Sequence, residues 1–254
     1  MLRRVGSRLP NGWGDLFLQL GIWFGFIGAY QIARGVADNG GAAEAMANGH
    51  AVIDVQRALH LLIEPDLQRV VITTGGVLLA AVDWTYWLSQ FSVLGVALLW
   101  IYLCRNDAFV RVRNWVLLAN LLGLVGYVLA PTAPPRMFPE YGFVDTLAQS
   151  ASLNHGSALV ELASNPYAAM PSLHAADSLI IGFAMATLVR SGWAKLLWTL
   201  WPSWVWFSVM ATGNHFWLDI AAGVGTAVLA GGMLALVESR RTETSPAWLL
   251  DRRG

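Results

Sequence analysis

Two histidine-containing segments carry the side chains of this chain that are best suited to chemistry. The first is Ala-Met-Pro-Ser-Leu-His, which ends at His174, and the second runs from Thr212 to Asp219. In the second segment, His215 and Asp219 are four residues apart, so they share one face of a helix. A carboxylate beside an imidazole fixes its tautomer and stabilises the imidazolium. His215 is therefore a candidate nucleophile or base, with Asp219 as its partner.

The first segment has the features of an anion-binding helix start. Pro171 and Ser172 come shortly before His174, and proline suits the first turn of a helix. Free amides at a helix N-terminus, together with a serine hydroxyl, can cradle a phosphate. We therefore predict that Ser172 binds an anion and that His174 protonates a leaving oxygen.

A third polar segment, Pro-Thr-Ala-Pro-Pro-Arg, ends at Arg136. Its prolines are rigid and would hold the guanidinium in one direction, where its fork matches a phosphate bidentately. Asp145 could hydrogen-bond a polyol headgroup, and Asp177 could orient His174 from three residues away. The alternative for each of these residues is an ordinary role as a helix cap, an interfacial residue or a loop residue.

A metal site is the less favoured alternative. His174, His215, Asp177 and Asp219 could supply ligands, but the sequence has no tightly spaced ligand motif. No cofactor motif is present either. We therefore expect activity that needs neither metal nor cofactor.

The composition indicates an integral membrane protein. Hydrophobic residues make up 56% of the chain and charged residues only 13%, whereas a soluble domain has about 25% charged residues. The formal net charge is zero, so there is no basic surface that would predict nucleic-acid binding.

The apolar runs predict an all-α membrane domain, a six-helix bundle that occupies the whole chain. A helix needs about 20 apolar residues to cross the hydrocarbon. The candidate spans are 16–33, 86–103, 114–130, 173–189, 196–212 and 216–237.

Residues 50–82 are predicted to form interfacial helices. Valines and leucines recur every three or four residues over 50–64, as in an amphipathic interfacial helix, although an ordinary packing helix fits equally well. The stretch 70–82 is apolar but too short to cross comfortably, and it is read as a separate interfacial or half-buried helix.

The basic residues predict the sidedness of the chain. Those at 105–113, at 190–195 and in the tail 238–254 fall on one face, whereas the outer loop 131–169 contains only Arg136. By the positive-inside rule this loop is extracytoplasmic, in a plasma or inner membrane. The three polar segments therefore converge on one outer face. The basic residues do not decide whether 70–82 adds a seventh span.

At these residues the chain resembles the type 2 phosphatidic acid phosphatase superfamily, whose three motifs have the form K-x6-R-P, P-S-G-H and S-R-x5-H-x3-D. The chain has two prolines followed by Arg136, and Pro-Ser-Leu-His ending at His174. It also has Ser208, His215 and Asp219 at the spacing of the third motif. The second and third motifs carry most of the resemblance.

Further segments, including Val-Asp-Thr around Asp145, resemble the branch related to fungal inositol phosphorylceramide synthase. The resemblance covers about residues 50–237. It implies a six-span helical bundle with the active site at its outer end.

The resemblance also implies a role for each site residue. His215 would attack phosphorus and form a phosphohistidine, with Asp219 orienting its ring. His174 would protonate the leaving group and later activate the acceptor. Arg136 and Ser172 would bind the phosphoryl oxygens.

The chain departs from the family pattern at three positions. Leu129 replaces the lysine of the first motif, Met137 replaces its last proline, and Val209 replaces the arginine of the third motif. A substrate with less charge at phosphorus would explain the loss of two cations, as would weak catalysis. A third explanation is an arginine that folds in from the outer segment. The candidates are Arg34, Arg57 and Arg69.

Together these observations predict a membrane lipid phosphatase or phosphotransferase that acts on a lipid-linked phosphate ester. The acceptor is a polyol such as inositol, a lipid alcohol or water, and the missing cations favour transfer of a headgroup unit. One alternative is a phosphatase for phosphatidic acid or a polyprenyl phosphate or diphosphate. A non-enzyme alternative is a protein that binds or transports lipid phosphates.

Overall fold

The computed structural model describes residues 9–37, 41–149 and 167–244 of the chain. The described part is helical, and its only β pairing is an isolated parallel bridge between Thr132 and Ala168. The predicted all-α class is therefore confirmed. Parts of the predicted outer loop and of the predicted tail lie outside the described residues.

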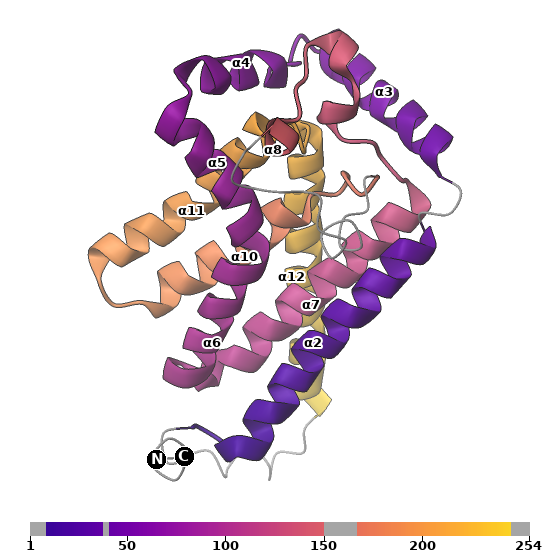
Figure 1. Cartoon of the computed structure of the whole chain (residues 1–254). Coiled ribbons are helices and arrows are strands. Elements are labelled where there is room, and N and C mark those ends of the chain that lie inside the picture. Colours follow the sequence, from indigo (N-terminus) through magenta and orange to yellow (C-terminus); the bar gives the residue numbers. More distant parts are fainter. Residues whose placement is uncertain (1–8, 38–40, 150–166, 245–254) are drawn as a thin grey trace.

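Long apolar helices form a bundle (Figure 1). They are α2 (Gly12–Ala37), α5 (Gly76–Leu88), α6 (Leu94–Cys104), α7 (Asn106–Leu129), α10 (Leu173–Leu188), α11 (Gly192–Ala211) and α12 (Trp217–Thr244). Each of the six predicted spans overlaps one of these helices or, for 86–103, the joined pair α5 and α6.

Three helical segments in the described part are both long and apolar enough to cross a membrane. They are Gly76–Cys104, Asn106–Leu129 and Trp217–Arg240, and α10 is an apolar but shorter helix. These helices are typical of an integral membrane protein. The number of crossings, six, stays a prediction.

The structure corrects the prediction for residues 70–82, which do not form one separate helix. Helix α4 (Glu64–Thr74) ends at Gly75, whose φ is 61°, and α5 begins at once with Gly76. Glycine adopts positive φ without a steric penalty, so the chain turns here. From Gly76 the helix continues through a π-helical turn, η1 (Ser89–Val93), into α6. The apolar helical segment Gly76–Cys104 therefore includes residues 76–82 and begins ten residues before the predicted span 86–103.

Helices α3 (Ala42–Ala58) and α4 lie across one end of the bundle (Figure 1). The face of α3 that packs inward carries Ala45, Gly49 and Ile53, whereas Val55 and Leu59 on the predicted apolar face remain exposed. An exposed apolar face suits a helix at the membrane interface. Short turns complete this end of the bundle. They are η2 (Pro135–Met137), η3 (Pro139–Tyr141) and α8 (Thr146–Gln149).

Two glycines of α7 allow the second motif to approach this helix closely. A Cβ at Gly123 would lie 2.5 Å from the Leu173 side chain, and one at Gly126 would lie 2.7 Å from the Pro171 ring. The Tyr127 hydroxyl donates a hydrogen bond of 3.0 Å to the Pro171 carbonyl. The C-terminal part of α7 therefore holds the start of α10 in place.

Candidate active site

The second motif forms the N-terminus of α10. Ser172 is the N-cap, and its Oγ accepts a hydrogen bond from the Ala175 amide at 3.3 Å. Its own amide donates to the Asp219 carbonyl at 2.9 Å. A Cβ at Gly223 of α12 would lie 2.2 Å from the Ser172 carbonyl oxygen. The second and third motifs are thus in backbone contact, and the close approach depends on a glycine.

The third motif forms the turn between α11 and α12. Gly213 has a φ of 71°, and a Cβ there would lie 2.8 Å from the Val144 carbonyl oxygen. Helix α12 then begins at Trp217, and Oδ2 of Asp219 accepts a hydrogen bond of 2.8 Å from the Phe216 amide. Asp219 therefore caps the helix from its third position, as the acidic residue of a capping box does.

His215 and Asp219 form the pair that their spacing predicts. The Nδ1 atom of His215 lies 3.4 Å from Oδ2 of Asp219 and 3.0 Å from the carbonyl oxygen of Ala169. Both oxygens are acceptors, so the proton of a neutral imidazole belongs on Nδ1 and the lone pair on Nε2. Both side chains are buried. This arrangement suits a nucleophilic imidazole.

His174 faces the same site from α10. Its ring centroid lies 5.6 Å from that of His215. Its Nε2 atom lies 3.2 Å from the Tyr86 carbonyl oxygen, and the Tyr86 ring stacks on it with centroids 4.5 Å apart. Tyr86 lies just before the π-helical turn η1, a distortion that is frequent at functional sites. The role of Tyr86 is not predictable from the sequence, because a backbone carbonyl leaves no signal in the residue type.

Arg136 contacts the third motif through Asn214. Its Nη1 atom donates to the Asn214 side-chain oxygen, and its amide donates to the Gly213 carbonyl at 2.8 Å. Oδ2 of Asp145 lies 3.6 Å from Nε of Arg136, while Oδ1 accepts from the Ala148 amide at 3.0 Å. Asp145 is therefore an ion-pair partner of Arg136 and a cap of α8, and its contact with a polyol stays a prediction.

Leu129 and Val209 occupy the two positions at which the family pattern has a cation. Leu129 is 74% exposed at the end of α7, and Val209 is fully buried in an apolar cluster with Val205 and Ile220. Neither side chain can replace a cation.

The arginines of the outer segment are engaged elsewhere. Arg57 lies over the Tyr141 ring, with its Cζ atom 5.8 Å from the ring centroid. Arg69 forms an exposed ion pair with Asp66 at 3.0 Å. The side chain of Arg34 lies outside the described part of the chain. The structure therefore does not support Arg57 or Arg69 as replacement cations.

Glu64 of α4 supports the start of α12, a contact that the sequence analysis missed. Its Oε1 atom accepts hydrogen bonds of 2.7 Å from the Trp217 amide and from the Gln56 side chain. Glu64 is fully buried, and this burial raises the pKa of its carboxyl above the ordinary value, against the opposing effect of the two hydrogen bonds. The outer segment is thereby tied to the helix that carries Asp219.

Gln68 of α4 makes a second such connection. Its side-chain nitrogen donates to the carbonyls of Val144 and Ala211 at 2.7 and 3.1 Å, and its oxygen accepts from the Val144 amide at 2.8 Å. These bonds join the loop after Arg136 to the end of α11. Gln68 was missed because a lone glutamine matches no motif.

Asp177 joins two helices of the bundle, because its Oδ1 atom accepts a hydrogen bond of 2.7 Å from Asn120 of α7. Its predicted orientation of His174 stays a prediction. Within the described residues there is no cluster of three or more His, Cys, Asp or Glu side chains placed to hold a metal ion.

The structure thus gathers five predicted residues where the second and third motifs meet. His174, His215, Asp219 and Ser172 come from the starts of α10 and α12, and Arg136 adjoins them through Asn214. Two histidines thus lie beside a carboxylate and an arginine at one end of an apolar helical bundle. Such an arrangement suits phosphoryl transfer at a membrane.

A family model described as the PAP2 superfamily matches residues 50–233. The chain therefore belongs to the PAP2 superfamily, a family of lipid phosphatases and phosphotransferases. The predicted resemblance is confirmed. The match excludes α2, which precedes residue 50.

Two known proteins are similar to parts of the chain. Phosphoinositol dihydroceramide synthase of Bacteroides thetaiotaomicron is 25% identical over 138 residues, which is 49% of this chain and 45% of the relative. The match therefore spans less than half of the relative's length. The crystal structure of Aquifex aeolicus LpxE aligns with a TM-score of 0.46 and 16% identity, over 66% of this chain and 92% of that chain.

Proposed function

We propose that this chain is a membrane phosphotransferase that moves a phosphoryl-headgroup unit from a phospholipid to an acceptor alcohol through a phosphohistidine at His215. The observation that carries this proposal is the geometry around His215. Its Nδ1 atom faces Asp219 and the Ala169 carbonyl, and a second imidazole, that of His174, lies 5.6 Å away between ring centroids.

In the first step, Nε2 of His215 attacks phosphorus, and the bond between phosphorus and the lipid oxygen breaks. His174 gives its proton to that oxygen, so a neutral lipid alcohol leaves. Asp219 stabilises the positive charge that develops on the His215 ring. Arg136 and Ser172 bind the phosphoryl oxygens, where charge stabilisation and positioning supply most of the catalysis.

In the second step, the acceptor hydroxyl gives its proton to His174. Its oxygen attacks phosphorus, the bond from phosphorus to Nε2 of His215 breaks, and the free histidine is restored. When water is the acceptor the reaction is hydrolysis, whereas a polyol or a lipid alcohol as acceptor gives transfer. The same two histidines serve both reactions.

The small number of cations supports a phosphodiester substrate. A phosphate monoester carries about −1.5 to −2 charges near neutral pH, and a diester lacks the second ionisable oxygen. Arg136 is the cation that contacts the third motif, and Leu129 and Val209 add none. The name of the Bacteroides relative, a phosphoinositol dihydroceramide synthase, also supports headgroup transfer.

The test uses purified chain in lipid nanodiscs with headgroup-labelled phospholipids, with and without polyol or lipid-alcohol acceptors. We expect new labelled lipid when an acceptor is present, and its loss by several orders of magnitude in His215→Asn. His60→Asn is the matched control, because His60 is exposed and its positive φ is tolerated by asparagine.

Three other results would contradict the proposal. Release of inorganic phosphate from phosphatidic acid or a polyprenyl phosphate, with no new lipid formed when an alcohol acceptor is present, would identify a phosphatase. Equal reaction rates in wild type and His215→Asn would exclude a phosphohistidine intermediate at His215. Binding of labelled lipid without any turnover in wild type would identify a lipid-phosphate binding or transport protein.

A further inference from the structure

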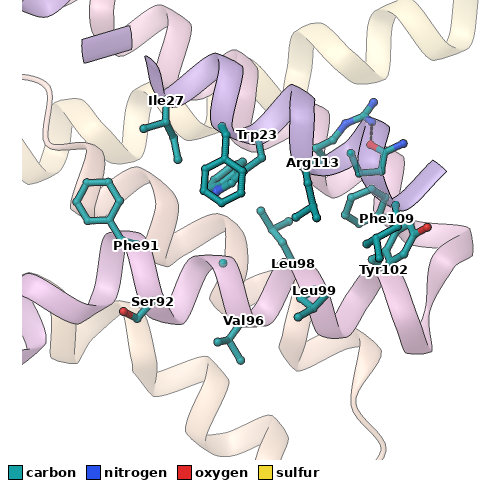
Figure 2. Close-up of a pocket in the computed structure, with 15 residues that line it drawn as sticks. Trp23, Ile27, Phe91, Ser92, Val96, Leu98, Leu99, Tyr102, Phe109 and Arg113 are labelled. Carbon is teal, nitrogen blue, oxygen red and sulfur yellow. Dashed lines mark hydrogen bonds between the residues drawn. The ribbon is translucent and has the colours of Figure 1, made fainter. Parts of the chain in front are cut away.

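A groove lies between α2 and the continuous helix of η1 and α6, and Phe109 and Arg113 of α7 also line it (Figure 2). It encloses about 480 Å³, and its lining is apolar except for Gln19, Ser92, Tyr102 and Arg113. Arg113 lies 14 positions before Tyr127, which contacts the second motif, and this is about 21 Å along α7. The Arg113 end of the groove is therefore distant from the catalytic histidines, and the α2 wall lies outside the matched family region.

The length of the groove corresponds to one leaflet of a bilayer. Its lining follows α2 from Leu16 to Ile27 and the opposite wall from Phe91 to Tyr102. Each wall advances about 16 Å at the helical rise per residue, which is about half of the roughly 30 Å hydrocarbon core. A single extended acyl chain of one leaflet has this reach.

The polar end of the groove carries an arginine with unused donors. The Arg113 guanidinium donates to the side-chain oxygens of Gln19 and Asn114 through three of its five N–H groups. No carboxylate in the described part of the chain forms an ion pair with it. The nearby Asp15 is engaged with Gln19 at 2.9 Å and with the Tyr102 hydroxyl at 2.8 Å.

Arg113 also lies at the boundary of a predicted membrane span. It stands immediately before the apolar run 114–130 of α7, and its Cζ atom lies 5.8 Å from the Phe109 ring centroid. Figure 2 shows Arg113, Phe109 and Tyr102 grouped at one end of the groove, with Ile27 and Phe91 at the other. The groove thus has one cationic end and one apolar end.

We propose that this groove binds one acyl chain of an anionic phospholipid from the leaflet opposite the candidate active site, with the lipid phosphate held by Arg113. An apolar opening inside a bilayer is filled by hydrocarbon, because water would gain no polar partners there. A guanidinium with two remaining N–H groups matches a phosphate bidentately. The bound lipid fills the gap between α2 and α6.

The test is native mass spectrometry of the full chain after reconstitution in vesicles of equal phosphatidylglycerol and phosphatidylcholine and extraction in mild detergent. We expect wild type to retain phosphatidylglycerol in preference to phosphatidylcholine. Arg113→Gln should lower this preference about tenfold, since a hydrogen-bonded charge pair is lost. Arg111→Gln is the matched control: it lies on the same end of α7, removes the same charge and does not line the groove.

A second pair of variants tests the acyl-chain part. Gly95 lines the groove, and a Cβ there meets no atom within 4 Å, so Gly95→Leu should fill the groove without disturbing the fold and should abolish lipid retention there. Gly21→Leu, at an exposed glycine of α2 with equally open space, should retain the lipid.

The proposal is overturned by any of three results. Wild type could retain no lipid, or Arg113→Gln could keep its full preference for phosphatidylglycerol. A lipid-free dimer that Gly95→Leu converts to a monomer would instead assign the groove to a second copy of the chain.

Discussion

The reactivity of His215 depends on where its proton is held. Both acceptors near Nδ1, the Asp219 carboxylate and the Ala169 carbonyl, favour the tautomer that exposes the lone pair of Nε2 to phosphorus. The preference comes from one side chain and one backbone group on different segments. The Asp219 carboxylate also stabilises the positive charge that develops on the ring.

We predict that Asp219→Asn lowers kcat by about 10- to 100-fold, because a neutral amide no longer stabilises the positive charge that develops on the His215 ring, and hydrogen bonds to charged groups contribute about 1.5–3 kcal/mol. The amide oxygen can still accept from the Phe216 amide, so the helix cap and the fold should persist. Single-turnover rates in nanodiscs and thermal unfolding would measure the two effects. Asp54→Asn, at an exposed position of α3, should leave both unchanged, and an unaltered rate in Asp219→Asn would remove Asp219 from the mechanism.

At the scale of elements, the start of α10 and the start of α12 are joined through a glycine. We predict that Gly223→Ala destabilises the fold by about 1–3 kcal/mol, because its Cβ would lie 2.2 Å from the Ser172 carbonyl oxygen and backbone must move. Gly225→Ala on the same helix meets open space and should be neutral or up to about 1 kcal/mol more stable. Denaturant unfolding in a fixed detergent compares them, and equal stabilities would contradict the packing.

The contact between α4 and α12 makes stability depend on pH. The pKa of Glu64 is raised by burial in the folded chain, so the folded state binds this proton more tightly than the unfolded state does. Protonated Glu64 therefore contributes fully to the free energy of unfolding below the ordinary carboxyl pKa, at about pH 4. This contribution is lost as pH rises through the raised pKa of the folded state.

Glu64→Gln should remove this part of the pH dependence, because a glutamine oxygen can still accept from the Trp217 amide without becoming charged. Midpoints of thermal unfolding from about pH 4 to about pH 8 would measure it. Glu140→Gln, at an exposed position of η3, serves as control. A wild-type midpoint that rises with pH relative to Glu64→Gln would have the wrong sign.

For the whole molecule, the distribution of basic residues predicts that the candidate active site faces away from the cytoplasm. The single cysteine, Cys104, is exposed at the end of α6, and Glu140 is exposed in η3 beyond the other end of α7. We expect a membrane-impermeant maleimide to label Glu140→Cys in a Cys104→Ser background on intact cells. Cys104 of the wild type should react only after permeabilisation, and the reverse pattern would invert the topology.

Features that depend on local spacing were predictable from the amino-acid sequence. Hydrophobic runs indicated the membrane helices, because a span of hydrocarbon demands apolar side chains whatever they pack against. The interval between His215 and Asp219 predicted their contact, because residues four apart share a helix face. The motifs also predicted the family that the match over residues 50–233 shows.

The contacts between separate segments of the chain became visible in the folded structure. It joined Arg136 to Asn214, Glu64 to the Trp217 amide and His174 to the Tyr86 carbonyl. It also broke the stretch 70–82 at Gly75. These contacts depend on close approaches between helices and on backbone amides and carbonyls. Because nearly every residue carries these backbone groups, the residue type does not reveal which of them are used. A linear sequence therefore specifies which faces are apolar or reactive, and the packing of the bundle decides which of them face each other.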